Sequence, residues 1–310
     1  MRAVVYTRYG PPEVLRLEEV PSPAPADDEV LVKVRATTVT IGDCRMRSLT
    51  VPAAQWLFAR LYLGVLRPRR PVLGMELAGD VEAAGKDVTR FKPGDAVTVS
   101  TFDVGFGGYA EYKCMPQDGV LVRKPPNLSY EEAAALPGGG MTALRCLGKA
   151  KIKPGQTVLV YGASGAVGTN AVQLAARHFG ARVTGVCSAA NLELVRSLGA
   201  RRVLDYAAED FTESGETYDA VFDAVGKLSS VQAKRARKLA GTYLDVHAES
   251  SGGHSTDNLQ FLAELAEAGV LKPVIDRTYP LEQIVEAHRY VDGGHKKGNV
   301  AVTVDPGDGP

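Results

Sequence analysis

Residues 157–188 read TVLVYGASGAVGTNAVQLAARHFGARVTGVCS. They predict a buried strand at 157–161, a glycine-rich turn, an amphipathic helix and a second β-branched strand. Gly162, Gly165 and Gly168 stand in the turn, where small residues let the backbone approach a pyrophosphate. The helix after the turn offers free N–H groups and the positive end of its dipole. A glycine pattern between a strand and a helix strongly indicates a dinucleotide site, and the alternative is a tight turn without a ligand.

The second strand lacks the acidic residue that an NAD site usually places at its end. It ends at Cys187-Ser188, and the first acid, Glu193, already lies in the next predicted helix. Ser188 and Asn191 are able to donate hydrogen bonds to a 2′-phosphate, and nothing anionic repels one. No Arg or Lys in this stretch supplies a charged partner. The pattern therefore favours NADP over NAD.

Composition limits the possible functions. The chain has 310 residues, 45% of them hydrophobic, which is enough for two cores. Lys+Arg and Asp+Glu both number 36, so no basic face for nucleic acid is expected. No apolar run approaches the ~20 residues of a membrane-spanning helix, and the first ten residues, MRAVVYTRYG, contain no apolar targeting region. We expect a soluble, cytoplasmic protein that binds neither nucleic acid nor membranes.

The four cysteines, at positions 44, 114, 146 and 187, are widely spaced. They form no CxxC pair and no cluster with the five histidines, so a disulfide framework is not expected. Buried, inert thiols are predicted. Cys44 and Cys187 stay candidates for a role because each adjoins a predicted site.

The pattern of predicted secondary structure changes near residue 125. Before it, short β-rich runs such as EVLVKVRATTVT at 29–40 are separated by Pro, Gly and Asp turns, which predicts an all-β, barrel-like unit. After Pro125-Pro126, strands alternate with helices, which predicts a parallel, doubly wound sheet. The expected elements are strands at 157–161, 182–187, 202–205, 219–223 and 242–247, and helices at 131–136, 142–149, 166–179, 191–198, 229–238 and 257–268.

The tail after Leu271-Lys272-Pro273 returns to a strand, a helix at Leu281–Tyr290 and a last strand, NVAVTV, at 299–304. We infer that this tail rejoins the N-terminal unit and makes that domain discontinuous. A separate short appendage is the alternative. The predicted domains are 1–125 with 272–310, and 126–271.

Eight segments in a fixed order carry a likeness to a known family: MRAVVYTRYGPPEVL, PVLGMELAGDVEAAGKDVTRFKPGDAV, GGYAEY, EEAAALPGGGMTAL, GQTVLVYGASGAVGTNAVQLA, ELVRSLGARRVLDY, YDAVFDAVG and HKKGNVAV. Nearly end to end, the chain resembles the zinc-free quinone oxidoreductase (zeta-crystallin-like) branch of the medium-chain dehydrogenases/reductases. The resemblance implies an α/β fold with a Rossmann domain, a GroES-like β-barrel substrate domain and an active site between them. It also implies NADPH, hydride transfer to or from a carbonyl or an activated C=C bond, and a homodimer.

The resemblance also excludes a metal. The zinc alcohol dehydrogenases hold their metal at positions where this chain has Thr40, Met75 and the stretch 136–140. None of these offers a thiolate or an imidazole, and a catalytic zinc needs three protein ligands. Glu76 follows Met75 and is interpreted as a buried carboxylate with a structural partner. We therefore predict no metal site.

Cofactor-binding roles are implied by the resemblance, residue by residue. They fall on Ser164, Gly165, Ala166 and Val167 at the pyrophosphate, on Ser188, Asn191 and Tyr206 near the 2′-phosphate, on Thr142, Val225 and His247 near the ribose or nicotinamide, and on Asn299 in the tail. Many relatives have Lys where Asn191 stands, and the lost charge weakens the preference for NADPH. Three of these positions also have a structural interpretation: Tyr206 as a half-buried strand-end aromatic, His247 as a strand-end histidine, and Asn299 as a turn residue.

The sequence identifies the residues of the chemical step less clearly than those that bind the cofactor. Reduction of an enone develops negative charge on the carbonyl oxygen, which needs a donor, and the α-carbon then needs a proton. Relatives often carry Asn-x-x-Asp where this chain reads TIGD at 40–43, and some have Tyr in place of Arg45. Thr40 and Arg45 are candidates to polarise the oxygen, or they form the cleft wall. Tyr62, in a predicted helical segment at 55–67, is a candidate proton donor or a packing residue, and water is the alternative donor.

The leading hypothesis is an NADPH-dependent, zinc-free reductase that acts on a small quinone, enone or 2-alkenal. An alcohol or ketone dehydrogenase is the first alternative, although alcohol oxidation in this superfamily relies on zinc. The second is a non-catalytic NADPH-binding protein, crystallin-like or accessory, which the departures from the family at Thr40, Arg45 and Asn191 favour.

Overall fold

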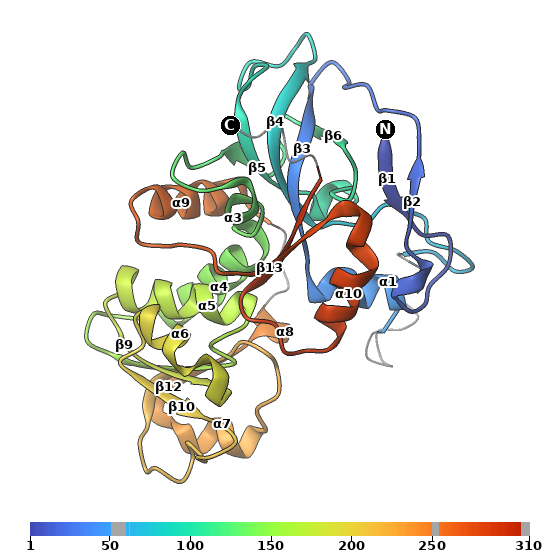
Figure 1. Cartoon of the computed structure of the whole chain (residues 1–310). Helices are drawn as coiled ribbons and strands as arrows, with labels where there is room; N and C mark the ends of the chain where they lie inside the picture. The colour runs from blue at the N-terminus through green and yellow to red at the C-terminus, as the bar shows by residue number, and fades with distance from the viewer. Residues whose placement is uncertain (51–59, 62, 250–253, 305–310) are drawn as a thin grey trace. The chain divides into compact units, whose positions relative to one another are not determined.

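The computed structural model describes residues 1–50, 60–61, 63–249 and 254–304. It divides the chain into two compact units (Figure 1). The units are Met1–Pro137 with His254–Ala263 and Ile275–Pro310, and Gly138–Gly253 with Glu264–Val274. Residues 126–137 and 254–263 thus belong to the first unit and residues 272–274 to the second, whereas the sequence places each of these segments in the other unit.

The first unit is built on a seven-stranded sheet. Its strands are β3 (Glu29–Val39), β4 (Glu76–Ala84), β5 (Ala96–Ser100), β6 (Tyr112–Pro116), β7 (Leu121–Arg123), β13 (Ile275–Pro280) and β14 (Asn299–Thr303). The order is β13-β14-β3-β4-β5-β7, with β6 also paired to β3, and only the β13–β14 pair is parallel. A separate antiparallel pair joins β1 (Arg2–Val5) to β2 (Arg16–Glu19). The short helices of this unit are η1 (Pro12–Val14), α1 (Ile41–Ser48), η3 (Phe102–Val104) and α3 (Tyr130–Ala134).

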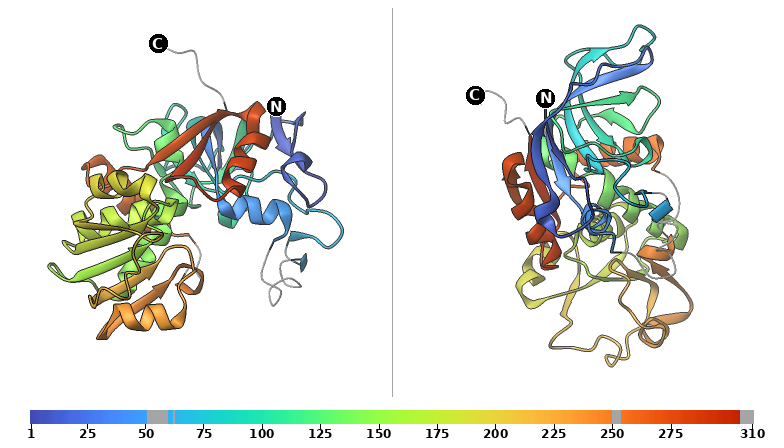
Figure 2. Two further views of the ribbon diagram at one scale, coloured as in Figure 1. Left: turned by 60° about the horizontal axis from the view of Figure 1, so that its bottom comes forward. Right: turned by 90° about the vertical axis from the view of Figure 1, so that its right-hand side faces the viewer.

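Strand β3 is the centre of this sheet because β4, β6 and β14 all pair with it. Val30, Val32 and Val34 alternate along it and are fully buried, as the period of a pleated strand requires. The C-terminal tail joins the same sheet, where Val300 of β14 pairs with Val39. Both views in Figure 2 show the red C-terminal strands and helix beside the blue N-terminal part of this unit. That helix is α10 (Ile284–Asp292), which comes after η6 (Leu281–Gln283).

The second unit contains a five-stranded sheet in the order β10-β9-β8-β11-β12. All four strand pairs are parallel, which confirms the predicted α/β class. The strands are β8 (Thr157–Tyr161), β9 (Arg182–Cys187), β10 (Arg202–Asp205), β11 (Tyr218–Asp223) and β12 (Arg237–Asp245). Helix α4 (Pro137–Ala150) precedes these strands, and α9 (Thr256–Glu267) begins in the first unit and ends in the second. The other helices of this unit are α5 (Ala166–Gln173), η4 (Leu174–His178), η5 (Ala189–Asn191), α6 (Leu192–Ser197), α7 (Ser230–Ala236) and α8 (Val246–Glu249).

The predicted boundary between a helix at 229–238 and a strand at 242–247 is wrong at both ends. Helix α7 ends at Ala236 and β12 begins at the next residue, because the basic run that favours a helix is recruited into parallel pairing with β11. At the other end, Asp245 Oδ1 accepts the backbone N–H of His247 at 2.7 Å and so begins α8. His247 therefore lies in a short helix and not at the end of a strand.

The cysteines are all free, and three of the four are buried as predicted. Cys114 is only half-buried, so that prediction is wrong for this residue. Burial raises the pKa of the Cys187 thiol to about 11, which leaves it protonated and inert. Cys44 lies 3.4 Å from Nδ1 of the buried His288, and burial raises its pKa as well. Neither thiol is suited to nucleophilic chemistry.

Within the described residues, no helix combines the length and the apolar character that crossing a bilayer requires.

Candidate dinucleotide-binding site

The strands of the second unit end in register at one edge of the sheet. Tyr161 pairs with Val186 and with Asp223, and Cys187 pairs with Asp205. The residues immediately after these strand ends must therefore share this carboxyl edge. The chain order also reverses here, because β9 and β10 lie on one side of β8 while β11 and β12 lie on the other. Such a switch point is where open parallel sheets bind their ligands.

The glycine-rich turn is fixed to the sheet by its backbone. The N–H groups of Gly162 and Ala163 both donate to the carbonyl of Val186 at 3.0 Å. Helix α5 begins directly after Gly165, and no side chain caps this helix start. The first N–H groups of α5, at Ala166 and Val167, are therefore available to an anion beyond the helix.

Different physical constraints account for glycine at positions 168 and 165 of this turn. A Cβ at Gly168 would lie 2.1 Å from the carbonyl oxygen of Gly162, so α5 could not approach the turn as it does. A Cβ at Gly165 would come no closer than 3.6 Å to that same oxygen. Protein packing thus requires Gly168 but leaves open space at Gly165. A pyrophosphate pressed against the backbone accounts for that space, so the turn fits a dinucleotide.

Asn191 has a role that the sequence did not predict. It is buried, and its Nδ2 donates to the hydroxyl oxygens of Ser164 and Ser188, at 3.1 Å in each case. Both amide hydrogens are engaged within the protein, and the direct bond from Asn191 to a phosphate stays a prediction. Each serine accepts from Asn191 and keeps its own hydroxyl proton for a ligand. Asn191 thus orients two donors that come from two different turns.

Tyr206 lies next to Ser188 at the sheet edge. Its backbone N–H donates to the carbonyl of Cys187 at 3.1 Å, and the paired residues Cys187 and Asp205 immediately precede Ser188 and Tyr206. The side chain is 54% exposed. Tyr206 thus follows the end of β10 with about half of its surface exposed, so its ring is available to cover a ligand held by Ser188, and its role at the phosphate stays a prediction.

The turn after β11 closes the other side of the glycine-rich turn. Val225 packs over Gly162, because a Cβ there would lie 2.8 Å from Val225 Cγ1. The His247 ring packs against Gly226 in the same way, because a Cβ there would lie 2.2 Å from His247 Cδ2. Both predicted residues therefore flank one small region of the second unit.

The sequence did not identify the residue that shapes this second turn. Asp223 is fully buried and accepts the backbone N–H groups of Val225, Gly226 and Leu228, at 3.1, 2.8 and 2.6 Å. A carboxylate that ends a buried strand was the available signal, since such a group must find several donors.

Thr142 lies on α4, which approaches α5 closely. A Cβ at Gly139 would lie 2.7 Å from the carbonyl oxygen of Ala166. Thr142 is three residues further on and shares that face of the helix. Beside this contact, the buried Oδ1 of Asn170 has no hydrogen-bond partner among the described residues. The start of α5 is thus flanked by polar groups on the α4 side.

Four predicted site residues belong to the first unit or lie outside the described residues. Thr40 caps α1, where its hydroxyl donates to Asp43 Oδ2 at 2.6 Å and accepts the Asp43 N–H at 3.1 Å. Its proton is engaged by Asp43, which favours the alternative that Thr40 forms the cleft wall, and its role toward a substrate oxygen stays a prediction. The Arg45 side chain is exposed, and Asn299 is buried at the start of β14. Tyr62 lies outside the described residues.

Two of the expected metal-ligand positions meet in space. Thr40 Oγ1 lies 3.4 Å from Met75 Sδ, so a hydroxyl and a thioether stand where a zinc enzyme has stronger ligands. Glu76 is buried and accepts a hydrogen bond from the Thr38 hydroxyl, which confirms its structural partner. Among the described residues, no three His, Cys, Asp or Glu side chains are grouped to hold a metal ion.

Asp43 is the most unusual titratable group near these residues. It is fully buried and accepts three hydrogen bonds, from the N–H and hydroxyl of Thr40 and from the N–H of Gly74. Burial nevertheless raises the pKa of its carboxyl to about 6, because desolvation outweighs these bonds. Asp43 thus ties the start of α1 to the segment before β4 at an electrostatic cost.

His254 is another residue whose contacts the sequence does not predict. Its Nδ1 makes a hydrogen bond with the Ser100 hydroxyl, and its ring stacks on Phe102 with centroids 5.1 Å apart. All three belong to the first unit. A lone histidine in a glycine-rich segment carries no sequence signal for such a contact.

The comparisons with known proteins agree with this geometry. Residues 26–126 match the family described as alcohol dehydrogenase GroES-like domain, and residues 227–302 match the one described as zinc-binding dehydrogenase. The 2-methylene-furan-3-one reductase of Solanum lycopersicum is 34% identical, over 97% of this chain and 79% of its own. The NADPH-dependent alkenal/one oxidoreductase of Arabidopsis thaliana, a chloroplastic protein, is 31% identical over the same shares. The structure of the quinone oxidoreductase from Coxiella burnetii has a TM-score of 0.85 at 29% identity and covers 98% of this chain and 99% of that one.

A GroES-like unit and a Rossmann unit with an open glycine-rich turn define a nicotinamide-dependent oxidoreductase. With relatives above 30% identity over nearly its whole length, the chain belongs to the zinc-free, quinone oxidoreductase-like family of medium-chain dehydrogenases/reductases.

The open space at Gly165 gives a direct test of the turn. In Gly165→Val, we expect nicotinamide cofactor binding to be lost, with unfolding free energy changed by less than about 1 kcal/mol. The backbone at Gly165, with φ −79° and ψ 176°, accepts any residue, and an added Cβ meets only the Gly162 carbonyl oxygen, at an ordinary contact distance of 3.6 Å. Titration of the cofactor by fluorescence, alongside urea unfolding, measures both quantities.

Gly168→Val is the matched control. Its Cβ meets the Gly162 carbonyl, so this variant should lose several kcal/mol of stability. Cofactor affinity unchanged by Gly165→Val would remove this turn from the site.

Asp43 predicts a pH dependence of stability. Its folded pKa of about 6 lies above the ordinary value of 3.8, so the folded state binds this proton more tightly than the unfolded state. Its contribution to the free energy of unfolding should therefore fall as pH rises from about 4 to about 6, by on the order of 2 kcal/mol. Between pH 4 and pH 7, urea unfolding should show the wild type losing about this much stability relative to Asp43→Asn, whose side chain does not titrate. Two parallel pH profiles would contradict this account.

Proposed function

We propose that the protein is an NADPH-dependent reductase of a small conjugated electrophile, namely a quinone, an enone or a 2-alkenal. The open space at Gly165 is the observation that carries the cofactor part of this proposal. The substrate class is supported by the relatives, which are named as reductases of a furanone, of alkenals and enones, and of quinones.

The chain's own residues account for binding of the cofactor. The N–H groups at the uncapped start of α5, those of Ala166 and Val167, receive the pyrophosphate. Ser188, held by Asn191, donates to the 2′-phosphate, and the exposed Tyr206 ring covers that end. The bound cofactor supplies the hydride. Val225 and His247 line the turn on the opposite side of the glycines.

The preference for NADPH over NADH rests on the residue at the end of β9. This strand ends at the buried Cys187, and the hydroxyl of Ser188 stands where an NAD site presents an acid to the ribose. Ser188 and Ser164 both keep a proton to donate. With no Lys or Arg in the turn between β9 and α6, the preference for NADPH should be moderate.

Dehydrogenation of a simple alcohol is the weaker alternative. It needs a Lewis acid or a strong base to lower the pKa of the alcohol, and Thr40 and Met75 are poor zinc ligands. The Thr40 hydroxyl is, moreover, engaged with Asp43.

The first experiment compares three acceptors: 1,4-benzoquinone, trans-2-hexenal and cyclohexanone. We expect the purified protein to oxidise NADPH with one or both of the conjugated acceptors and not with the ketone. Its zinc content, measured on the same sample, should be well below one ion per chain. Saturable NADPH binding without turnover of any acceptor would instead support the non-catalytic NADPH-binding alternative.

Ser188→Asp tests the cofactor preference. The new carboxylate repels the 2′-phosphate, accepts the ribose hydroxyls and can still receive the Nδ2 hydrogen of Asn191. We expect the ratio of kcat/KM for NADPH to that for NADH to reverse. Ser197→Asp, an exposed change on the same stretch of chain, should leave the ratio unaltered. An unchanged ratio in Ser188→Asp would remove Ser188 from the site.

A homodimer and a cytoplasmic location stay predictions from the sequence. For the dimer, the exposed Leu239 on β12, the last strand in its sheet, supports pairing between two copies, and light scattering would measure the mass in solution. For the location, cell fractionation is the direct measurement.

A further inference from the structure

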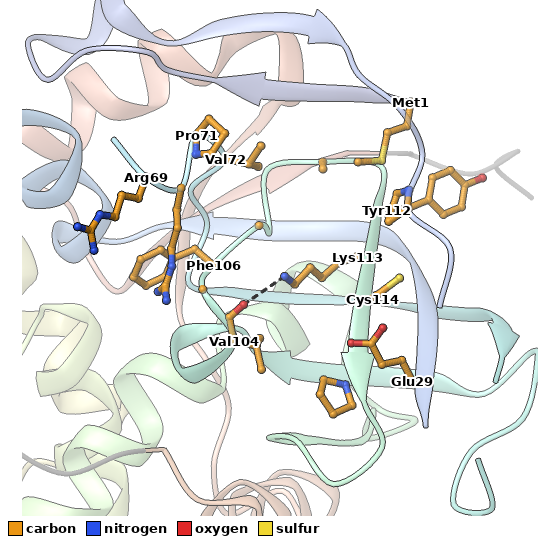
Figure 3. A pocket seen from close by; sticks show the side chains of 16 residues that line it. Met1, Glu29, Arg69, Pro71, Val72, Val104, Phe106, Tyr112, Lys113 and Cys114 are labelled. Carbon is orange, nitrogen blue, oxygen red and sulfur yellow. Dashed lines mark hydrogen bonds between the residues drawn. The ribbon is translucent and has the colours of Figure 1, made fainter. Parts of the chain in front are cut away.

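A pocket of about 500 Å³ lies in the first unit, and none of its lining residues is assigned to the dinucleotide site. Its walls come from β6, from the end of the segment before β4 and from the loop between η3 and β6 (Figure 3). This volume lies within the range of pockets that hold small organic ligands.

The charged side chains of this cavity are mostly cationic. Arg69, Arg70 and Lys113 line it, and Glu29 is the one carboxylate among its described lining residues. Arg70 and Lys113 are close enough that Arg70 helps to lower the pKa of the Lys113 ammonium, although burial is the main cause. Two cations that converge on one cavity favour an anion between them.

Lys113 has little to bind within the protein. Its side chain is half-buried, and its ammonium lies 3.5 Å from the carbonyl oxygen of Val104, the longest distance that counts as a hydrogen bond (Figure 3). This is its single hydrogen bond in the described part of the chain. Its remaining donors are therefore directed to whatever occupies the cavity.

The loop before β6 fixes both cations in place. Gly105 and Gly107 have φ values of +85° and +110°, which glycine adopts readily. A Cβ at Gly105 would lie 3.0 Å from Arg70 Nε, and one at Gly107 would lie 3.2 Å from Lys113 Nζ. The loop backbone thus lies directly against both side chains. The Arg70 guanidinium is also placed over the Phe106 ring, 5.5 Å from its centroid.

Apolar side chains form a second part of the wall. Val72, Val104, Phe106 and Pro71 line the cavity around the cations. A ligand that satisfies this surface needs one oxyanion and a short hydrocarbon body. Glu29 disfavours a doubly charged group such as a phosphate monoester, since each added charge increases the repulsion.

We propose that this cavity binds a monocarboxylate with a short aliphatic or aromatic body. Lys113 and Arg70 hold the carboxylate, for which the planar guanidinium fork is well shaped. The hydrocarbon body lies against Val72, Val104 and Phe106. This site is independent of the cofactor and of the proposed reduction.

Calorimetric titration of the full chain with octanoate tests the proposal. We expect saturable binding that Lys113→Met and Arg70→Met each weaken at least tenfold, because Met keeps the length of the side chain but removes its charge. Glu29→Gln should tighten binding, since it removes the one opposing charge. Lys86→Met, which changes an exposed lysine paired with Asp27, is the matched control and should have no effect.

Two further ligands separate the sources of affinity. Octanol, which has the same body without the charge, and inorganic phosphate should both bind at least tenfold more weakly than octanoate. Thermal unfolding of each variant, followed by circular dichroism, shows that the first unit is folded, since Arg70, Lys113 and Glu29 all belong to it. The proposal is overturned if octanol binds as tightly as octanoate, if both Met variants bind octanoate like the wild type, or if Glu29→Gln weakens binding.

Discussion

The approach of α5 to the first turn of the parallel sheet is the constraint on which the second unit depends. A Cβ at Gly168 would lie 2.1 Å from the carbonyl oxygen of Gly162, so only glycine lets α5 come this close to the turn. That contact brings the uncapped start of α5 to the carboxyl edge of β8. Everything proposed for the cofactor depends on it, because the helix N–H groups, the open space at Gly165 and the Val225 side chain all surround the same turn.

The polar groups at this edge form a second layer of organisation. Asn191 uses both amide hydrogens on two serines, and Asp223 uses its two oxygens on three backbone N–H groups. Asp223 thus satisfies the N–H groups of its turn, and Asn191 leaves Ser164 and Ser188 with their own protons to donate to a ligand. A buried amide or carboxylate placed in this way fixes a turn without itself touching a ligand.

The sequence predicted the fold class and the glycine-rich turn correctly because both depend on local patterns. Alternating strands and helices dictate a parallel sheet, and Gly162, Gly165 and Gly168 specify the turn. The prediction from the sequence was wrong where pairing with a distant segment determines the secondary structure. The basic run at the start of β12 looks helical until β11 is available to pair with it.

Hydrogen-bond partners of single side chains were also beyond the sequence. Thr40 and Asn191 each bear groups suited to a ligand, and only the folded chain shows that Asp43, Ser164 and Ser188 already use them. Asp223 and His254 went unnoticed because their partners come from backbone groups or from residues far away in the chain.

The engaged hydroxyl of Thr40 bears on the kind of substrate that this family member can reduce. An isolated ketone becomes a localised alkoxide and needs a metal or a strong donor at its oxygen. Thr40 and Met75 supply neither, since one donates to Asp43 and the other is a thioether. An enone or a quinone spreads the developing charge over a conjugated system and needs less help from the protein. The donor set at the lost metal position therefore favours electrophiles that stabilise their own negative charge.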